Sequence, residues 1–403
     1  MSSSIVTHGF GVRKYRELKT EHTAGQVILH LEKQPQHQRC ADCGSSHVIR
    51  KGQELRRIRT LPIGRREVFL ELHLHRLLCR RCGALKLEPL LVSFPRKSWT
   101  KTLGRYVLEL VQRMTIEDVA EHLHMSWDTI KEIHRWALDR KFKKRRIKHL
   151  RRLAVDEVAV RKGHRYLTIV LDLDSGEVVW VCEGRESQSL EPFLKRLRRA
   201  GVPIEAIAMD MWPAYLHAVA QYFSSQVIVF DRYHVIADYN KMLDQLRCDE
   251  AAAAARADKP LYKGTRYLLL TGQENLANRQ GAKDKVNRLL QLNHSLSVAY
   301  ILKEELREFW SCPDRLAAEA YLASWLHEAS TSGIALLIKF ANKLAAHRSG
   351  LLNYFDHPIT TAKVEGTNNK IKVLKRRAYG YRDIGYFKLR IYFIHQARYA
   401  LTG

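Results

Sequence analysis

The first part of the chain carries two hydrophobic patterns, one typical of strands and one typical of helices. Four aliphatic residues occupy every second position after a turn at residues 62–64: Val68, Leu70, Leu72 and Leu74. This period predicts a β-strand. Residues 98–138 instead show the helical period. Within them, residues 115–138 form a candidate helix-turn-helix, in which Ser126 can cap the second helix.

From residue 153 the pattern changes to short apolar runs separated by turns. Three runs are followed by a helical stretch, a fourth run, another helical stretch and a fifth run that ends at Asp231. This succession predicts strand, strand, strand, helix, strand, helix, strand. Residues 233–355 are helical in pattern and form a predicted insertion. Capping signals at residues 360–361 then introduce a further helix, and a last helix begins near Asp383.

The charge of the chain points to a polyanionic partner. The 403 residues include 68 Lys and Arg against 42 Asp and Glu, so the formal net charge is +26, far more than solubility requires. Nucleic acid is favoured as the partner over an acidic membrane surface or an acidic protein. No apolar run approaches the ~20 residues of a membrane span, and the N-terminus lacks a signal-peptide core. We therefore expect an intracellular protein with no membrane partner.

Four of the seven cysteines occur in two Cys-x-x-Cys-Gly pairs: Cys40, Cys43, Cys79 and Cys82. This spacing is typical of a zinc ribbon, and four thiolates leave no open coordination position. We expect one structural Zn²⁺ rather than a catalytic one. A disulfide pair or four idle thiols is the alternative. Cys182, Cys248 and Cys312 are interpreted as buried reduced thiols.

The helix-turn-helix and the segment after it supply candidate DNA contacts. Residues at the leading edge of the second helix could reach base edges or phosphates: Ser126, Trp127, Asp128, Thr129, Lys131 and Arg135. Residues 139–152 hold nine Lys or Arg in fourteen positions, which favours an arm that follows the phosphate backbone. Its candidate contacts are Lys143, Lys144, Arg145 and Arg146. A plain helical hairpin and a flexible basic linker are the alternatives.

Three acidic residues lie where the predicted order of strands would gather them. Asp156 lies in the first strand, Asp210 ends the fourth, and Glu365 lies on the helix after the insertion. Buried carboxylates are tolerated close together only when cations neutralise them, and such oxygen ligands favour Mg²⁺ or Mn²⁺. Two such ions can activate water or a 3′-hydroxyl and stabilise the leaving oxygen of a phosphoryl transfer. By itself, a triple of separated acids is weak evidence for this chemistry.

Two further acids compete for this site. Strand alternation puts Glu157 on the face opposite Asp156, so only one of the two can serve, and we favour Asp156. Asp231 ends the fifth strand and ranks fourth, either as a ligand or as a structural partner of Arg232 or His234.

The helix that carries Glu365 has a polar and basic face. Glu365, Asn368, Asn369 and Lys372 follow at i, i+3, i+4 and i+7, so they share one side of the helix. The asparagines could orient a ligand or the nucleophile, and Lys372 would approach a phosphate. Three residues would continue this face as a ridge that binds the DNA backbone: Lys375, Arg376 and Arg377.

Several stretches of the chain resemble the ISL-three family of bacterial insertion-sequence transposases. In order, they are VDEVAVRKGHRYLTIVLDL, AMDMWPAY, VFDRYHV, KGTRYLLL and VEGTNNKIKVLKRRAYGYRD. The two cysteine pairs and the helix-turn-helix resemble the N-terminal modules of that family, so the resemblance covers nearly the whole chain. It implies an RNase H-like core whose catalytic triad of two aspartates and one glutamate corresponds to Asp156, Asp210 and Glu365.

The resemblance also implies how such a protein acts. A homodimer or higher oligomer would bind the terminal inverted repeats of the element on double-stranded DNA, cleave their 3′ ends and transfer them into target DNA. It would work in the bacterial cytoplasm, associated with the nucleoid. Three tryptophans could stack on bases in this process, although core packing is the favoured role: Trp212, Trp310 and Trp325.

The sequence therefore predicts an α/β multidomain DNA transposase. Its expected parts are a zinc-ribbon DNA-binding domain at 1–95, a helix-turn-helix domain with a basic linker at 96–150, an RNase H-like mixed-sheet catalytic core at 151–234 and 356–403, and an all-helical insertion domain at 235–355. The alternatives are a DNA-binding regulator with a catalytically inactive core and a structure-specific nuclease of the same fold.

Overall fold

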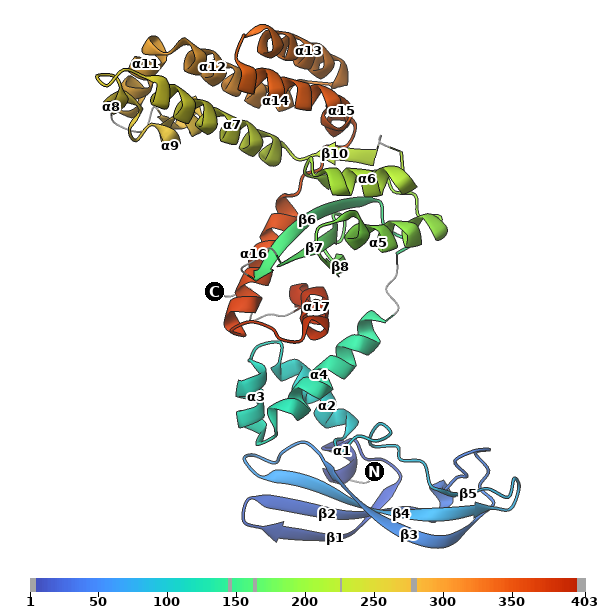
Figure 1. Cartoon of the computed structure of the whole chain (residues 1–403). Coiled ribbons are helices and arrows are strands. Elements are labelled where there is room, and N and C mark those ends of the chain that lie inside the picture. The colour runs from blue at the N-terminus through green and yellow to red at the C-terminus, as the bar shows by residue number, and fades with distance from the viewer. Residues whose placement is uncertain (1–4, 144–146, 162–164, 225–226, 277–280, 397–403) are drawn as a thin grey trace. The chain divides into compact units, whose positions relative to one another are not determined.

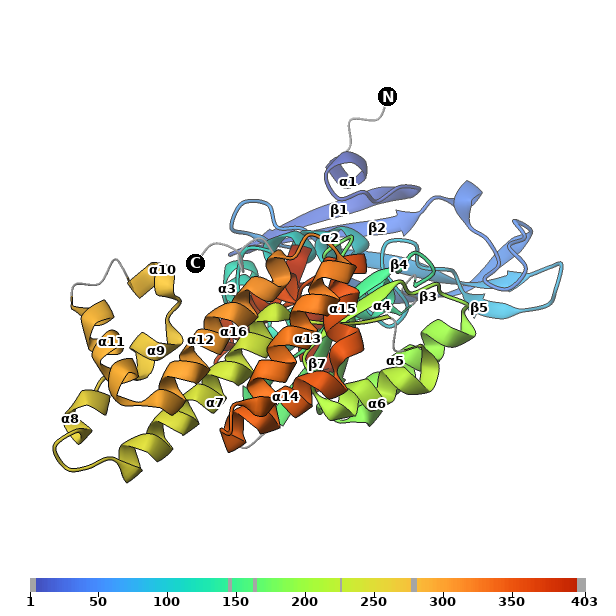
Figure 2. The ribbon, with the colours of Figure 1, turned by 90° about the horizontal axis from the view of Figure 1, so that it is seen from above.

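The chain divides into two compact units. The structure is a computed structural model that describes residues 5–143, 147–161, 165–224, 227–276 and 281–396. One unit comprises Met1–Lys144 with Tyr381–Gly403, and the other comprises Arg145–Gly380. The elements of both are labelled in Figures 1 and 2. Among the described residues, no helix combines the length and the apolar character needed to cross a membrane.

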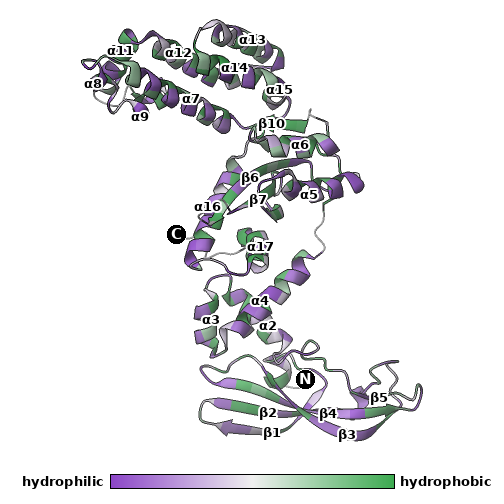
Figure 3. Cartoon of the chain, in the orientation of Figure 1, coloured by the Kyte–Doolittle hydropathy of each residue, from purple (hydrophilic) through white to green (hydrophobic). Residues whose placement is uncertain are grey.

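The first unit contains a five-stranded sheet with the order β1-β2-β4-β3, and β5 pairs with β4. Its strands are β1 (Tyr15–Thr23), β2 (Gln26–Lys33), β3 (Val48–Arg59), β4 (Glu67–Cys79) and β5 (Leu85–Leu87), with the short helix α1 (Ile5–His8) before them. The four aliphatic residues predicted to line one face of a strand lie in β4 and are fully buried, which confirms that strand. The edge strand β1 is largely hydrophilic, whereas β2 is largely hydrophobic (Figure 3).

Three helices follow the sheet: α2 (Lys101–Leu110), α3 (Ile116–Leu123) and α4 (Trp127–Phe142). Thr115 and Asp118 form a capping box at the start of α3. His124 takes a left-handed φ of 50° between α3 and α4, the conformation that glycine often supplies in this turn. The Ser126 side chain then accepts a hydrogen bond from the Thr129 backbone N–H at 3.2 Å. The predicted helix-turn-helix and its cap are confirmed.

The last helix of the chain, α17 (Ile384–Tyr392), packs against α4. The Tyr386 hydroxyl lies 2.7 Å from Nδ1 of His134, and both side chains are buried. Leu138 and Phe393 complete this apolar cluster. Residues 356–403 were expected to complete the catalytic core, but in the structure Tyr381–Gly403 belong to the same compact unit as the helix-turn-helix. The apolar face of α4 that remains uncovered by α2 and α3 explains this placement.

The second unit is built around a mixed sheet with the order β10-β9-β6-β7-β8. Its elements are β6 (Arg152–Arg161), β7 (Arg165–Asp172), β8 (Val178–Glu183), α5 (Ser187–Arg199), β9 (Ala206–Met209), α6 (Pro213–Tyr222) and β10 (Ile228–Phe230). The first three strands are antiparallel, whereas β9 pairs parallel to both β6 and β10. The predicted succession is confirmed, and this topology is RNase H-like.

Helices occupy the chain between β10 and the last helix of this unit. They are α7 (Arg232–Ala253), α8 (Lys259–Tyr262), α9 (Arg266–Leu270), α10 (Gln273–Leu276), α11 (Ala282–Leu292), α12 (His294–Glu308), α13 (Arg315–Thr331), α14 (Ala335–Ala346) and α15 (Arg348–Asp356). Helices α7, α12, α13 and α14 lie side by side (Figures 1 and 2). Trp310 and Trp325 are buried among them, which confirms their predicted role in packing. The chain then returns to the sheet as α16 (Ala362–Arg377), which packs on β6 and β7.

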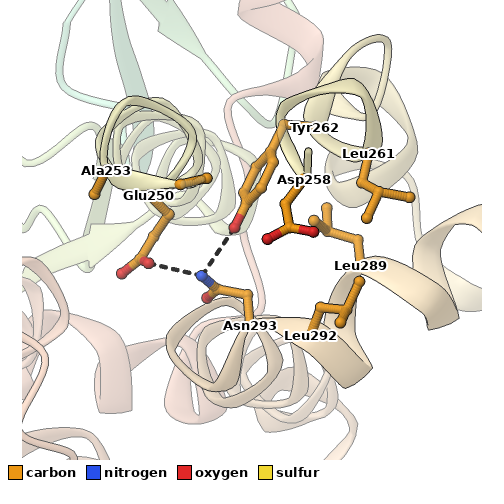
Figure 4. A pocket seen from close by; sticks show the side chains of 9 residues that line it. Glu250, Ala253, Asp258, Leu261, Tyr262, Leu289, Leu292 and Asn293 are labelled. Carbon is orange, nitrogen blue, oxygen red and sulfur yellow. Dashed lines mark hydrogen bonds between the residues drawn. The ribbon is translucent and has the colours of Figure 1, made fainter. Parts of the chain in front are cut away.

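The insertion encloses a hollow of about 240 Å³ between α7, α8 and α11. At its edge, the Asn293 amide nitrogen donates to Glu250 at 2.6 Å and to the Tyr262 hydroxyl at 3.1 Å (Figure 4). The Asn293 side-chain oxygen accepts from the Leu296 N–H and so caps α12. These contacts tie three helices together, so we assign the hollow a structural role.

Candidate active site and DNA-binding elements

The two cysteine pairs come together at one end of the sheet in the first unit. The four sulfurs lie within 4.8 Å of one another. Each pair forms its own turn of the same type. In each turn, a glycine with φ near 70° donates its N–H to the carbonyl oxygen of the first cysteine: Gly44 to Cys40, and Gly83 to Cys79. A positive φ at these positions is what requires glycine. The sequence prediction of a four-thiol cluster is thereby confirmed.

The pKa values and the spacing of the four thiols indicate a metal-binding site. The backbone N–H of Cys82 lowers the pKa of the Cys79 thiol to about 6. The backbone N–H of Ala84 acts in the same direction on Cys82, yet the thiols of Cys43 and Cys40 outweigh it and raise the pKa of Cys82 to about 12. Four thiolates at this spacing repel one another unless a metal neutralises them, and tetrahedral sulfur ligands suit Zn²⁺. The cluster therefore fits one structural zinc ion.

The other three cysteines differ from the prediction. They are free thiols, as expected, but Cys248 is exposed and Cys182 and Cys312 are half-buried. The expected burial was wrong, because Cys248 lies on the hydrophilic side of α7, where the guanidinium of Arg247 approaches its sulfur at 3.1 Å.

In the second unit, the sheet places two aspartates beside each other. Strands β6 and β9 are parallel neighbours, with Leu153 opposite Ile207 and Ala154 opposite Ala208. Asp156 lies two residues after the last of these pairs, and Asp210 directly follows β9, so both aspartates come at the same end of the two parallel strands. Burial raises the pKa of Asp156, and the nearby Asp210 raises it further. Burial also raises the pKa of Asp210, while His234 at the start of α7 opposes the rise.

Helix α16 completes this face of the sheet through Asn368. Its amide nitrogen donates to Oδ2 of Asp156 at 2.8 Å and to the carbonyl oxygen of Glu157 at 3.3 Å. Asn368 is buried, and its side-chain oxygen has no hydrogen-bond partner within the described structure. An unpaired buried acceptor beside two carboxylates is costly unless a cation or its water is bound there. This oxygen-rich corner therefore fits Mg²⁺ or Mn²⁺.

Glu365 lies on the same helix but is not gathered as tightly. It is exposed in the first turn of α16, one turn before Asn368. Among the described residues, only the four cysteines bring three or more candidate ligand atoms within 4.8 Å of one another. The structure thus joins Asn368 to Asp156 with Asp210 nearby, and it does not gather Glu365 with the two aspartates.

The opposite side of β6 carries Glu157. Its carboxylate lies 3.4 Å from the Tyr215 hydroxyl and 3.6 Å from the guanidinium of Arg185. The predicted separation of Asp156 and Glu157 onto different faces agrees with these partners, since α16 contacts the first and α6 contacts the second.

Asp231 has a structural role at the start of two helices. Its Oδ1 accepts from the backbone N–H groups of Tyr233 and His234 and so caps α7, and its Oδ2 accepts from the Thr361 N–H at 2.8 Å. The side chain of Thr361 makes no capping bond itself. A buried Asp231 therefore fixes where α16 begins, and the predicted structural link to His234 runs through the backbone.

The candidate DNA contacts lie on α4 and α16. Trp127 is 41% exposed at the start of α4, with the Lys131 ammonium over its ring. The Asp383 carboxylate holds Lys131 at 3.5 Å and Arg135 at 2.5 Å. On α16, Asn369, Lys372, Arg376 and Arg377 are exposed, whereas the Lys375 ammonium donates to the Val160 carbonyl. Lys143 is exposed after α4, and Lys144, Arg145 and Arg146 lie outside the described residues.

Two neighbours of the acidic site were not predicted as such, Arg185 and His234. Arg185 lies outside the family-like stretches, and His234 was considered only as a partner of Asp231. The signal available in the sequence is positional: both residues come directly after predicted strands, where ligands gather on sheets of this kind.

These parts define a DNA transposase: an RNase H-like core with an acidic face, preceded by a zinc ribbon and a helix-turn-helix. A family model described as "Transposase" matches residues 153–391. A second, the helix-turn-helix domain of transposase family ISL3, matches residues 95–134, and a third, the zinc-finger of transposase IS204/IS1001/IS1096/IS1165, matches residues 36–82. The chain belongs to the ISL3 family of transposases, as the resemblance indicated, and its activity is DNA cleavage and joining.

Individual relatives agree with this assignment. The transposase for insertion sequence element IS1001 of Bordetella parapertussis is 35% identical over 357 residues, which cover 87% of each chain. The transposase for insertion sequence element IS1557 of Mycobacterium tuberculosis is 29% identical over 376 residues, covering 86% of this chain and 83% of the relative. A solved structure, the Drosophila P element transposase strand transfer complex, covers 73% of this chain and 92% of its own with a TM-score of 0.40 and 13% identity, too low to support a conclusion.

Proposed function

We propose that this transposase binds the terminal inverted repeats of its insertion sequence, cleaves their 3′ ends and transfers them into target DNA, with Asp156, Asp210 and Glu365 as the metal-binding triad. The observation that supports the proposal is the hydrogen bond from the buried Asn368 to Asp156, with the Asn368 oxygen unpaired and the charge of Asp210 acting on the same carboxylate. A pair of half-buried carboxylates with raised pKa values stores unfavourable energy that a divalent cation relieves.

Each residue of the site has a distinct task in this proposal. Asp156 and Asp210 would hold the ions, and Glu365 would complete the ligand set from the first turn of α16. Asn368 orients the Asp156 carboxylate through its amide nitrogen. When bound, the two Mg²⁺ or Mn²⁺ ions supply charge that activates the attacking oxygen and stabilises the leaving oxygen. Exposed Asn369 and the basic residues of α16 would hold the DNA backbone beside this face.

The helix-turn-helix supplies recognition in the same proposal. Ser126, Trp127 and Thr129 at the start of α4 would enter the major groove, while Lys131, Arg135 and the basic residues after α4 would contact phosphates. Synapsis of two element ends would require a homodimer or a higher oligomer.

A footprint of the protein on the DNA flanking its own gene tests the proposed substrate. We expect protection of two inverted copies of one sequence, one at each end of the element. An assay with an oligonucleotide that ends at the exposed 3′-hydroxyl then tests joining. Covalent transfer of that oligonucleotide into a plasmid supports the proposal. Protection without cleavage indicates a regulator, and cleavage of unrelated DNA without joining indicates a structure-specific nuclease.

A further inference from the structure

Hydrogen bonds hold the backbone of the loop that follows β8, close to Glu157 and to the segment after Asp210. Gly184 has a φ of 89°, and its N–H donates to the Tyr166 carbonyl at 2.9 Å. The Thr168 hydroxyl donates to the Gly184 carbonyl at 2.8 Å, and the Trp212 indole N–H donates to the Arg185 carbonyl at 2.9 Å. Three hydrogen bonds from two other segments therefore fix the backbone at Arg185 independently of its side chain.

The Arg185 guanidinium lies within cation–π distance of two aromatic rings. Its central carbon is 4.7 Å from the centroid of Tyr166 and 4.8 Å from that of Trp212. The side chain remains 34% exposed, and its nearest acid is Glu157 at 3.6 Å. No side-chain hydrogen bond joins this guanidinium to another described residue, although an arginine carries five N–H donors. The stacking fixes the guanidinium, and apart from the ion pair with Glu157 its donors remain available.

Trp212 also connects Arg185 to Asp210. The backbone N–H of Trp212 donates to Oδ1 of Asp210 at 3.2 Å, while its indole holds the Arg185 carbonyl. Glu157, the acid nearest Arg185, is the neighbour of Asp156 along β6. Trp212 thus holds the Asp210 carboxylate with its backbone N–H and the Arg185 backbone with its indole N–H.

We propose that Arg185 binds a phosphate of the DNA strand at the Asp210 end of the carboxylate site, on the Glu157 side of β6, and that Trp212 and Tyr166 position its guanidinium for this contact. The inference rests on the proposed function of the carboxylate site. Three carboxylates, on Asp156, Glu157 and Asp210, would repel an incoming phosphodiester, so a fixed cation at their border lowers that barrier. A planar guanidinium that stacks on aromatic rings can also engage two phosphate oxygens at once.

The test combines Arg185 variants with chemically altered DNA. The probe is a duplex oligonucleotide of the element end mapped by the footprint, with a neutral methylphosphonate placed in turn at each backbone position around the cleavage site. Arg185→Gln and Arg185→Lys are compared with Arg199→Gln, which removes the same charge from the exposed end of α5. Binding is measured in Ca²⁺ and single-turnover cleavage in Mg²⁺.

We expect Arg185→Gln to weaken binding and slow cleavage about tenfold or more, as expected for one lost phosphate contact. For the wild type, a neutral linkage at one backbone position should lower binding and cleavage by about the same factor. With that linkage in the probe, Arg185→Gln should bind and cleave no worse than the wild type. Arg185→Lys should recover the salt dependence of binding but only part of the cleavage rate. Arg199→Gln should match the wild type at every position.

A different interference pattern would overturn the proposal. If every neutral linkage weakens Arg185→Gln as much as it weakens the wild type, no phosphate is bound by Arg185. Partial misfolding cannot imitate the expected pattern, since it would lower binding equally for all probes. Asp156→Asn separates this result from the proposed function: wild-type cleavage by that variant would refute the carboxylate site, while the phosphate pattern of Arg185 is measured by binding alone.

Discussion

The polar side chain that most constrains the acidic site is Asn368. It was predicted from helical spacing alone, as one of two asparagines that could orient a ligand or contact DNA. The structure separates the pair, because Asn368 is buried with its amide on Asp156 whereas Asn369 is exposed. Substituting a residue that hydrogen-bonds a metal ligand typically lowers metal affinity or activity about 10- to 100-fold.

We therefore predict that Asn368→Ala lowers Mg²⁺-dependent cleavage about 10- to 100-fold and raises the Mg²⁺ concentration needed for half-maximal rate. The physical reason is that the Asp156 carboxylate loses the donor that fixes its orientation. Cleavage rates measured across a Mg²⁺ titration check this. Asn369→Ala is the matched control: it can weaken DNA binding but should leave the Mg²⁺ concentration for half-maximal rate unchanged. An equal rise of that concentration in both variants would contradict the role given to Asn368.

At the scale of elements, the zinc ribbon depends on the contact between two cysteine turns, which meet through their four thiols. Each turn contributes two thiols and one glycine with positive φ, and the sulfurs lie within 4.8 Å of one another. Four thiolates at this spacing repel one another, and a bound metal ion removes that repulsion.

Removal of one ligand should consequently release the metal. We expect one zinc ion per wild-type chain by elemental analysis and less than half of that for Cys79→Ser, with a lower melting temperature and weaker DNA binding. Cys182→Ser removes a thiol outside the cluster and should retain a full zinc complement. Wild-type protein that binds DNA normally after complete zinc removal would contradict a structural zinc.

The helix-turn-helix contains a buried histidine that makes its stability depend on pH. Burial, followed by the charge of Arg390, lowers the pKa of His134 well below its usual value of 6.5. The folded unit therefore holds His134 neutral, whereas the unfolded chain takes up a proton below about pH 6.5. Stability from this residue is fully present above that pH and is lost as the pH falls below it.

We predict that the melting temperature of the wild type falls between pH 7 and pH 5.5 more steeply than that of His134→Gln, which cannot take up the proton. Melting curves at constant ionic strength check this difference in slope. Parallel slopes for the two proteins would show that His134 is protonated equally in both states.

Most elements could be predicted because their hydrophobic periods are strong and local. The alternation in β4, the cap at Ser126 and the succession from β6 to β10 follow from residues within one element. The other strands of the β4 sheet were not predicted, because β1 and β3 are rich in charged residues without a clear alternation and β5 is only three residues long. The position of α17 was missed for another reason. The face of α4 that binds it pairs with residues far along the chain, such as His134 with Tyr386, 252 positions later, and no local pattern reveals such a pairing.

Some residues of the site could be predicted from local patterns and others could not. Asp156 and Asp210 follow from parallel strands, where sequence position and spatial position correspond. Glu365 was placed correctly on its helix, but the distance from that helix to the strands depends on tertiary packing. Arg185 was missed, because its role arises from two aromatic rings on separate elements.

At the scale of the whole molecule, the catalytic unit is inserted within the DNA-binding unit. The chain leaves the first unit after Lys144 and returns to it at Tyr381. Helix α16, which carries Glu365, is followed within a few residues by α17, which packs on the recognition helix α4. The two functions are therefore joined by two covalent connections.

This topology predicts that a residue near the C-terminus supports DNA binding by α4. Tyr386→Ala removes a buried ring and the hydroxyl that pairs with His134, at a cost of about 3 kcal/mol. We expect a lower melting temperature and weaker binding to the element end. Tyr379→Ala removes a fully exposed ring nearby in sequence and should leave the melting temperature unchanged. Equal melting temperatures for Tyr386→Ala and the wild type would contradict the packing of α17 on α4.

The most direct test of the account is single-turnover cleavage of the element end by Asp156→Asn, Asp210→Asn and Glu365→Gln, with DNA binding measured on the same preparations. These substitutions keep size and remove charge, so each variant should bind DNA as the wild type does and lose Mg²⁺-dependent cleavage by at least about 1,000-fold. Cleavage at the wild-type rate by any one of them would remove that residue from the triad. Retained cleavage by both aspartate variants would contradict the central claim.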